Sequence, residues 1–227
     1  MGSVATVEKG RHAGKVDSSR LLEMEQAFLA NGGEFKTVKV GELFHIQPTK
    51  NYGLTNRDLF TTKGNTPVVV NSSLDNGIGG WVDLKPTENG GIITFSDTTT
   101  SDSIFYQPKD FIGYSHVQGM YPFDKECWTE KPLRYFVAVF RSATAGLFNY
   151  GNKFNRASAR EIEVWLPYQN NQIAFDFMEN FVYELQASRL RELQTYLQVT
   201  GLSDYVLIDE EKMALAQFDE LLSKSGG

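Results

Sequence analysis

Two cationic side chains and one amide lie within a single short segment, at Lys153, Asn155 and Arg156. Ammonium and guanidinium groups form charge-assisted hydrogen bonds to phosphate oxygens, and an amide can hydrogen-bond to a phosphate or to a base edge. The alternative is structural, with residues 150–155 forming a turn that holds the strand after it. Contact with the phosphates of a nucleic acid is the chemistry that these residue types favour.

Other polar side chains occupy loops between short apolar runs. Loops held by a rigid sheet often carry recognition residues, and hydrogen bonds at base edges read a nucleic-acid sequence. The candidates are Lys50, Tyr52 and Arg57 in a basic loop; Asn71, Ser72 and Asn76 beside a turn; Thr98, Thr99 and Ser101 in a polar run; and His116 and Tyr121 in a glycine-punctuated stretch. For each group the alternative is a structural role, as a solvated loop, a turn former or a histidine satisfied within the fold.

Sequence motifs for catalysis, cofactor binding and metal binding do not occur in the chain. It has no Asn-Pro-Pro-Tyr motif for a flipped base, no Gly-Lys-Ser/Thr phosphate loop and no Gly-x-Ser-x-Gly nucleophile turn. The histidines are far apart, and the single cysteine, Cys127, rules out a Cys-x₂-Cys zinc motif. We therefore expect no cofactor, no metal and no catalysis in this chain; a hydrolase whose triad is invisible in sequence is the enzyme alternative.

The formal net charge of −6 is unevenly distributed along the chain. Residues 35–167 carry 14 basic and 13 acidic groups, whereas residues 168–227 carry 4 basic and 10 acidic groups. A near-neutral middle segment permits a local basic face but does not by itself show one. A single cysteine, no apolar run long enough for a membrane span and no secretory signal predict a reducing, cytoplasmic setting.

The elements that must hold these residues change in character along the chain. A short helix is predicted over residues 17–31, followed by a Gly-Gly stop. Residues 35–168 then contain short apolar runs, many β-branched or alternating, separated by turn formers. The predicted strands are Thr37–Ile46, Pro67–Val70, Gly91–Phe95, Ser103–Tyr106 and Glu161–Leu166.

Two further expectations concern this β-rich segment. The run Lys131–Thr144 fits a strand or a helix, and we favour a helix opening at Pro132 because its apolar residues fall on one helical face. Large aromatic side chains fill cores of this kind. We therefore expect the three tryptophans in the core, namely Trp81, Trp128 and Trp165.

A long amphipathic helix of about 28 residues, about 40 Å long, is predicted within the segment that begins at Asn170, and Gly201 ends it. Its apolar stripe consists of Phe177, Phe181, Leu185, Leu190, Leu193 and Leu197. A helix of this kind usually pairs with another helix, although its first turns can pack on their own domain. A last helix is predicted from Asp209, which gives the predicted segments 1–34, 35–168, 169–200 and 201–227.

The two ends of the chain share a short pattern. A helix containing Gln26-Ala27-Phe28 precedes Gly32-Gly33, and a predicted helix containing Ala216-Gln217-Phe218 precedes Gly226-Gly227. The β-rich segment begins directly after the first Gly-Gly pair. Either the similarity is chance, or the chain is one half of a duplicated protein.

Several blocks in order resemble the target-recognition domains of type I restriction-modification specificity subunits, and also specificity subunits of type IIB-like systems. The first block, residues 35–46, resembles their first strand. The later blocks are Pro67–Ser73 with Asn76–Trp81, then Gly91–Phe95, then Phe105–Gln107, and last Phe148–Arg156 running to Ile162–Pro167. Each block is weak alone, but five in this order before a long helix are fairly specific, and the likeness extends over residues 35–200.

The resemblance implies an α+β fold, with a β-rich target-recognition domain that contains embedded helices and a coiled-coil-like spacer helix after it. It implies a non-catalytic reader of one half of a bipartite double-stranded DNA target. The implied partners are methyltransferase subunits, which would hold S-adenosylmethionine, and a restriction subunit. The spacer helix would pair with a second copy or a second recognition domain through Phe181, Leu185, Leu190, Leu193 and Leu197.

The chain differs from the usual specificity subunit in its number of recognition domains, and a different function is also open. Specificity subunits usually carry two recognition domains and this chain carries one, so we expect it either to dimerise or to be a fragment. The rival from another class is a non-catalytic ligand-binding or assembly β module with no DNA role, in which aromatic loop residues such as Tyr121 stack on the ligand.

Overall fold

The computed structural model describes residues 18–97, 101–149 and 151–202, together with residues 206, 209, 212 and 213. The chain divides into two units. The larger is Ser19–Glu184, and the smaller comprises Leu185–Gly227 with the N-terminal residues up to Ser18. The helix predicted from Asp209 lies almost wholly outside the described residues.

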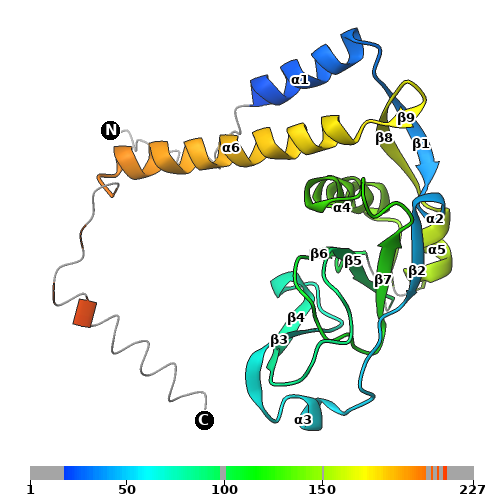
Figure 1. The fold of residues 1–227 in the computed structure, drawn as a ribbon, viewed down its shortest axis with the longest axis vertical. Coiled ribbons are helices and arrows are strands. Elements are labelled where there is room, and N and C mark those ends of the chain that lie inside the picture. The colour runs from blue at the N-terminus through cyan, green and yellow to red at the C-terminus, as the bar shows by residue number, and fades with distance from the viewer. Residues whose placement is uncertain are drawn as a thin grey trace, which may run out of the picture. The chain divides into compact units, whose positions relative to one another are not determined.

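The described elements alternate between short strands and helices (Figure 1). In chain order they are α1 Ser18–Ala30, β1 Glu34–Lys39, α2 Val40–Leu43, β2 Phe44–Pro48, α3 Asn56–Leu59, β3 Lys63–Val69, the 3₁₀ turn η1 Asp75–Gly77, β4 Ile78–Val82, β5 Ile92–Ser96, β6 Phe105–Gln107, β7 Val117–Pro122, α4 Glu130–Thr144, α5 Arg156–Glu161, β8 Glu163–Gln169, β9 Gln172–Ile173 and α6 Phe175–Val199. The predicted α+β class, a β-rich domain with embedded helices before a long helix, is confirmed. In the described part of the chain, no helix combines the length and apolarity needed to span a membrane.

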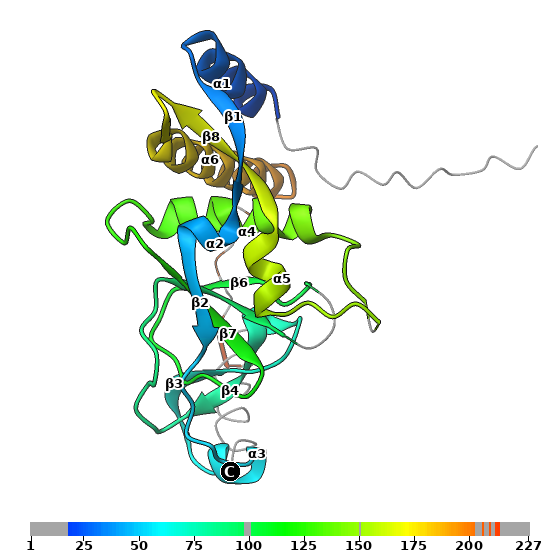
Figure 2. The same cartoon turned by 90° about the vertical axis from the view of Figure 1, so that its right-hand side faces the viewer.

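Three small sheets form the β-rich domain. A four-stranded sheet has the order β2-β7-β5-β6, a three-stranded sheet the order β1-β8-β9, and β3 pairs with β4 alone. All pairings between these strands are antiparallel. Figure 2 shows α5 beside β2, where the Arg160 guanidinium donates a hydrogen bond of 2.6 Å to the Ile46 carbonyl.

The prediction of one strand over Thr37–Ile46 is wrong. The run forms two strands in different sheets, with the helical turn α2 between them. At this break the Val40 N–H donates to the Ile162 carbonyl at 3.0 Å, a contact between residues far apart in sequence. A local alternating pattern does not contain that partner, so it reads as one continuous strand.

Helix α4 packs several large side chains into the core. The helical reading of Lys131–Thr144 is confirmed, and Leu133, Phe136 and Phe140 are at most 1 % exposed. These side chains meet aromatic residues of the four-stranded sheet, including Phe44, whose ring lies 4.6 Å from that of Phe136. Burying each such side chain contributes about 1.5–3 kcal/mol, so this contact anchors the sheet that carries the loops described below.

The prediction that all three tryptophans lie in the core is correct for one of them. Trp128 is 4 % exposed, whereas Trp81 and Trp165 are 46 % and 62 % exposed. Successive side chains of a strand point to opposite faces, and the neighbours Val82 and Val164 take the inward positions. The two strand tryptophans therefore point outward.

Helix α6 has 25 residues, Phe175–Val199, and confirms the long helix predicted to end at Gly201. The residues before it form a hairpin of β8 and β9, whose turn places Asn170 and Asn171 at φ 53° and 61°. Asparagine tolerates this left-handed conformation better than most residues. Within the larger unit α1 lies beside the first turns of α6, where the ring of Phe28 stacks on that of Phe177 at 4.2 Å (Figure 1).

Candidate nucleic-acid interface

Three loops far apart in sequence are joined by hydrogen bonds into one surface, which we call the loop cluster and define as residues 49–57, 85–91 and 113–116. The Lys50 N–H donates to the Glu88 carboxylate at 2.6 Å, and the Thr87 hydroxyl donates to the Lys50 carbonyl at 2.6 Å. The Tyr52 hydroxyl donates to the Lys85 carbonyl at 2.9 Å. The third loop packs so closely on the first that Gly113 has no room for a side chain, because a Cβ there would lie 2.5 Å from the Lys50 carbonyl oxygen.

Glu88 is the buried centre of the loop cluster. It is 8 % exposed, and its second carboxylate oxygen accepts a hydrogen bond of 2.9 Å from the Tyr121 hydroxyl. Burial, followed by the hydrogen bond to Glu88, raises the pKa of Tyr121 well above its usual range, so this phenol stays protonated and donates. Tyr121 therefore supports the loop cluster from strand β7.

The outer side of the loop cluster presents groups that can bind a nucleic acid. Lys50, Tyr52, Arg57 and His116, all predicted contacts, are exposed there. Beside them is a hollow of about 300 Å³, lined in part by Asn51, Tyr52, Tyr114 and Ser115. The cationic and hydroxyl groups suit phosphates, and the amide and imidazole suit base edges.

His116 has a backbone conformation that turns its ring outward. Its φ of 65° is unusual for a residue other than glycine, and its side chain is 66 % exposed. The ring Nδ1 lies 3.1 Å from an Asp97 carboxylate oxygen, and the other oxygen of that carboxylate accepts from the Gln118 amide at 2.8 Å. Asp97 thus orients an imidazole that is largely exposed to solvent.

Asn71, Ser72 and Asn76 form a second group beside η1. The Asn76 amide donates to the Tyr106 carbonyl at 3.0 Å, and the Ser72 hydroxyl accepts from the Leu74 N–H at 3.0 Å. The structural roles that the sequence offered for Ser72 and Asn76 are therefore real. Asn71 is exposed, and its role in recognition stays a prediction.

Lys153, Asn155 and Arg156 form a third group at the start of α5. The Asn155 side-chain oxygen caps that helix, accepting from the backbone N–H groups of Ala157 and Ser158 at 2.9 and 3.1 Å. The two cationic side chains flank this cap and are exposed. Asn155 therefore has the structural role, as a helix cap, whereas Lys153 and Arg156 remain the predicted phosphate contacts.

The polar run of residues 98–101 is only partly described. Thr98 and Thr99 lie outside the described residues. Ser101 is 8 % exposed, and its hydroxyl donates to the Thr144 carbonyl at the end of α4 at 3.2 Å. Its side chain holds the loop to the helix rather than facing solvent.

The predicted spacer residues fall into two classes. Phe181 packs within the larger unit, with its ring 5.6 Å from that of Tyr135, and Leu185 and Leu197 are half-buried. Leu190 and Leu193 are 60 % and 52 % exposed. Leucines this exposed on a long helix are typical of an uncovered pairing face.

Sequence reasoning missed three cationic residues. Lys85 is exposed in the loop cluster, and the Pro86 and Asn89-Gly90-Gly91 turn signals after it could have indicated a loop. The guanidinium groups of Arg134 and Arg141 on α4 lie over the rings of Tyr106 and Phe105, at 4.9 and 4.7 Å from the ring centres. Because these pairs join a helix to a strand, sequence spacing alone gives no signal for them. Among the residues that the structure describes, no group of histidine, cysteine, aspartate and glutamate could hold a metal ion.

Comparisons with known proteins identify a family by sequence and related structures by fold. A sequence model described as "Type I restriction modification DNA specificity domain" matches residues 32–195. The chain is similar in fold to the type I restriction-modification S subunit of M. genitalium, with a TM-score of 0.53 and 15 % identity over 82 % of this chain and 47 % of that one.

A second similar structure is the HsdS subunit of Thermoanaerobacter tengcongensis, with a TM-score of 0.45 and 12 % identity over 89 % of this chain and 50 % of that one. The chain thus spans about half the length of these structures. None of the curated proteins matches it. The match to the family model covers most of the chain, and the chain therefore belongs to the family of type I restriction-modification DNA specificity domains.

Proposed function

We propose that this chain recognises one half of a bipartite double-stranded DNA target within a type I-like restriction-modification complex. The observation that carries the proposal is the match of the DNA specificity family over residues 32–195, which include the whole loop cluster. In the proposal the chain is not catalytic, and methyltransferase subunits that bind S-adenosylmethionine carry out the reaction, with a restriction subunit as a further partner.

The loop cluster is the proposed reading surface. Lys50, Arg57 and Lys85 would bind phosphates and supply a salt-dependent affinity that is independent of sequence. His116, oriented by Asp97, would contact a base edge, where a good contact discriminates by about 1–3 kcal/mol. The buried carboxylate of Glu88 ties its own loop to the Lys50 backbone and to Tyr121 of β7, which gives the rigid support that a reading surface requires.

Helix α6 is the proposed spacer. Its later turns expose Leu190, Leu193 and Tyr196, and an apolar face of this kind is covered when a second helix packs against it. The second helix would come from another copy of the chain or from a second recognition domain. The spacer would then fix the distance between two half-sites.

The test is a selection experiment on the assembled complex. The purified chain is mixed with the methyltransferase subunit from the same source and incubated with randomised duplex DNA, and the retained duplexes are sequenced. A motif of a few fixed base pairs that depends on this chain would support the proposal. A stable complex without enrichment would reduce the chain to an assembly subunit, and the absence of a complex would favour a ligand-binding module.

A further inference from the structure

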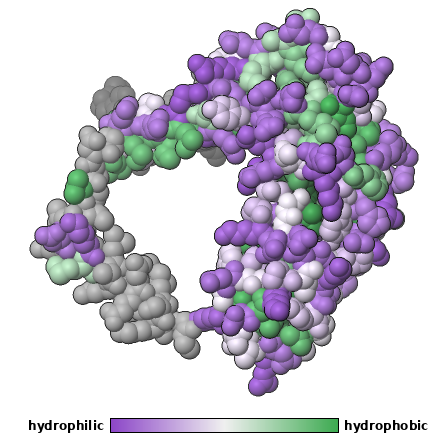
Figure 3. Space-filling view, in the orientation of Figure 1, coloured by the Kyte–Doolittle hydropathy of each residue, from purple (hydrophilic) through white to green (hydrophobic). Residues whose placement is uncertain are grey.

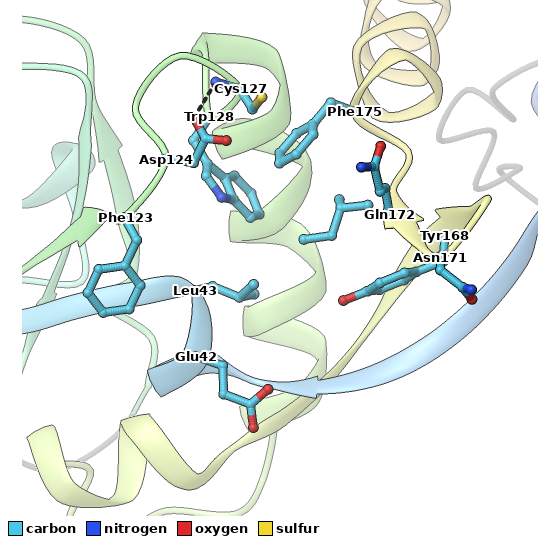
Figure 4. A pocket seen from close by; sticks show the side chains of 11 residues that line it. Glu42, Leu43, Phe123, Asp124, Cys127, Trp128, Tyr168, Asn171, Gln172 and Phe175 are labelled. Carbon is cyan, nitrogen blue, oxygen red and sulfur yellow. Dashed lines mark hydrogen bonds between the residues drawn. The ribbon is translucent and has the colours of Figure 1, made fainter.

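A recess in the larger unit lies between the start of α4, the turn α2 and the β8–β9 hairpin (Figure 4). Its volume is about 450 Å³. The residues that matter most among its lining are Glu42, Phe123, Asp124, Trp128, Tyr168 and Phe175. None of its lining residues belongs to the proposed DNA surface, so the recess needs an explanation of its own.

The floor and walls of the recess are aromatic. The ring of Trp128, which is 4 % exposed, lies 5.2 Å from that of Phe175 at an angle of 86°. Phe123 at the rim is 64 % exposed, although most phenylalanines of this chain are buried or half-buried. An exposed phenyl ring beside a hollow of this size is typical of a surface that a partner covers.

The rim of the recess is acidic. Figure 4 shows the carboxylates of Asp124 and Glu42 on opposite sides of the space. Hydrogen bonds from the Cys127 thiol and backbone N–H lower the pKa of Asp124, so this group is ionised at neutral pH. The described residues that line the recess include no lysine or arginine.

One aromatic ring of this recess, that of Tyr168, already contacts a cation. The ammonium of Lys36 lies 5.5 Å from the centre of the Tyr168 ring and pairs with the Glu34 carboxylate at 2.6 Å. The Glu34 carboxylate offsets the charge of Lys36 and reduces its repulsion of a second cation. The same ammonium donates to the Asn171 side-chain oxygen at 3.2 Å, and Asn171 and Tyr168 both line the recess, so a cation already lies at its edge.

We propose that this recess receives an arginine side chain from a partner protein. A guanidinium group stacks on aromatic faces and donates paired hydrogen bonds to carboxylates, which matches rings on the walls and carboxylates at the rim. A lysine ammonium is more strongly hydrated and cannot stack, so it fits less well. The proposal is independent of the DNA-reading function, because it uses different residues and a protein ligand.

The experiment uses the chain's single cysteine as a reporter. Cys127 is exposed and lines the recess, so the rate at which iodoacetamide alkylates it reports the occupancy of this site alone. The probe is a blocked pentapeptide, Gly-Ser-Arg-Ser-Gly, titrated into the full chain at millimolar concentrations. Its control has citrulline, an uncharged isostere, in place of the arginine. Rates are compared at a pH where the thiol is fully ionised, because a bound cation would otherwise lower the thiol pKa and speed the reaction. There we expect the arginine peptide to slow alkylation and the citrulline peptide to have no effect.

Two variants identify the contacts. Glu42→Gln is expected to weaken the apparent affinity about two- to fivefold, which corresponds to one exposed ion pair. Phe123→Ala leaves every charge in place, so a loss of protection there separates contact from long-range attraction. Both residues are exposed, so neither change is expected to unfold the protein. Asp124 is left unchanged because it hydrogen-bonds to the reporter thiol, and Asp83→Asn, an exposed acid outside the recess, is the matched control.

The proposal is supported if the arginine peptide alone protects Cys127 and both recess variants weaken that protection while Asp83→Asn does not. Equal protection by the citrulline peptide would show an apolar site without preference for a cation. Equal protection by free guanidinium at the same concentration would show a small-ion site. Either of these results, the absence of protection, or unchanged protection in the variants would overturn the proposal.

Discussion

Replacing Glu88 with alanine is expected to destabilise the protein by about 3 kcal/mol. Glu88 is 8 % exposed and accepts two hydrogen bonds, from the Lys50 N–H at 2.6 Å and from the Tyr121 hydroxyl at 2.9 Å. A hydrogen bond to a charged group contributes about 1.5–3 kcal/mol. Lys50 is exposed and Tyr121 is half-buried, so water reaches both donors once the carboxylate is gone. The loss in unfolding free energy therefore falls at the lower end of the summed contributions of the two hydrogen bonds.

Glu88→Gln is the matched control for this prediction. Its side-chain carbonyl still accepts from the Lys50 N–H, and its amide can donate to the Tyr121 oxygen, so only the charge assistance is lost. We expect this variant to cost about 1 kcal/mol. Urea unfolding of the two variants and the wild type, with free energies from midpoints and slopes, measures both values. An alanine variant within about 0.5 kcal/mol of the wild type, or a glutamine variant as unstable as alanine, would refute this account of the loop cluster.

The remaining predictions concern other parts of the chain. Lys153→Ala should weaken DNA binding alike for all sequences and flatten the salt dependence by about one unit, and a changed sequence preference at constant slope would refute the phosphate role. Burial raises the pKa of Tyr135 to about 12, so its contribution to stability is complete below its unfolded pKa of about 10 and is lost as the pH rises toward 12. Tyr135→Phe should remove that loss in urea unfolding at alkaline pH. Asn155→Ala should cost about 1 kcal/mol in the same assay and Asn155→Asp much less, because aspartate also caps helices. Replacing Leu190 and Leu193 with aspartate should abolish helix pairing in analytical ultracentrifugation of the assembled complex without unfolding the larger unit.

The long-range contacts of this fold are what the sequence could not reveal. Helix α4 was predictable because three-four spacing places Leu133, Phe136 and Phe140 on one face, a property of the segment itself. The break between β1 and β2 depends on a hydrogen bond from Val40 to Ile162, which no local pattern contains. Local reasoning therefore succeeded for single elements and failed where a distant partner decides the outcome.

The candidate site shows the same limit. The cationic and polar loop residues were recognisable by type, and Lys50, Tyr52 and His116 do lie in exposed loops. Their grouping depends on Glu88, which sequence reasoning did not single out, because a lone glutamate in a turn-rich segment resembles any solvated acid. Only its burial, and its hydrogen bonds to Lys50 in a second loop and to Tyr121 on β7, mark it as the centre of the loop cluster.

Whether the loop cluster reads DNA sequence can be measured by comparing the motifs that variant complexes select. Complexes assembled with the wild-type chain, with His116→Ala or with Lys85→Ala are each offered randomised duplex DNA, and the retained duplexes are sequenced. We expect His116→Ala to lose preference at one position of the motif, and Lys85→Ala to keep the motif but bind more weakly at every sequence. A wild-type motif and unchanged affinity in both variants would contradict this expectation.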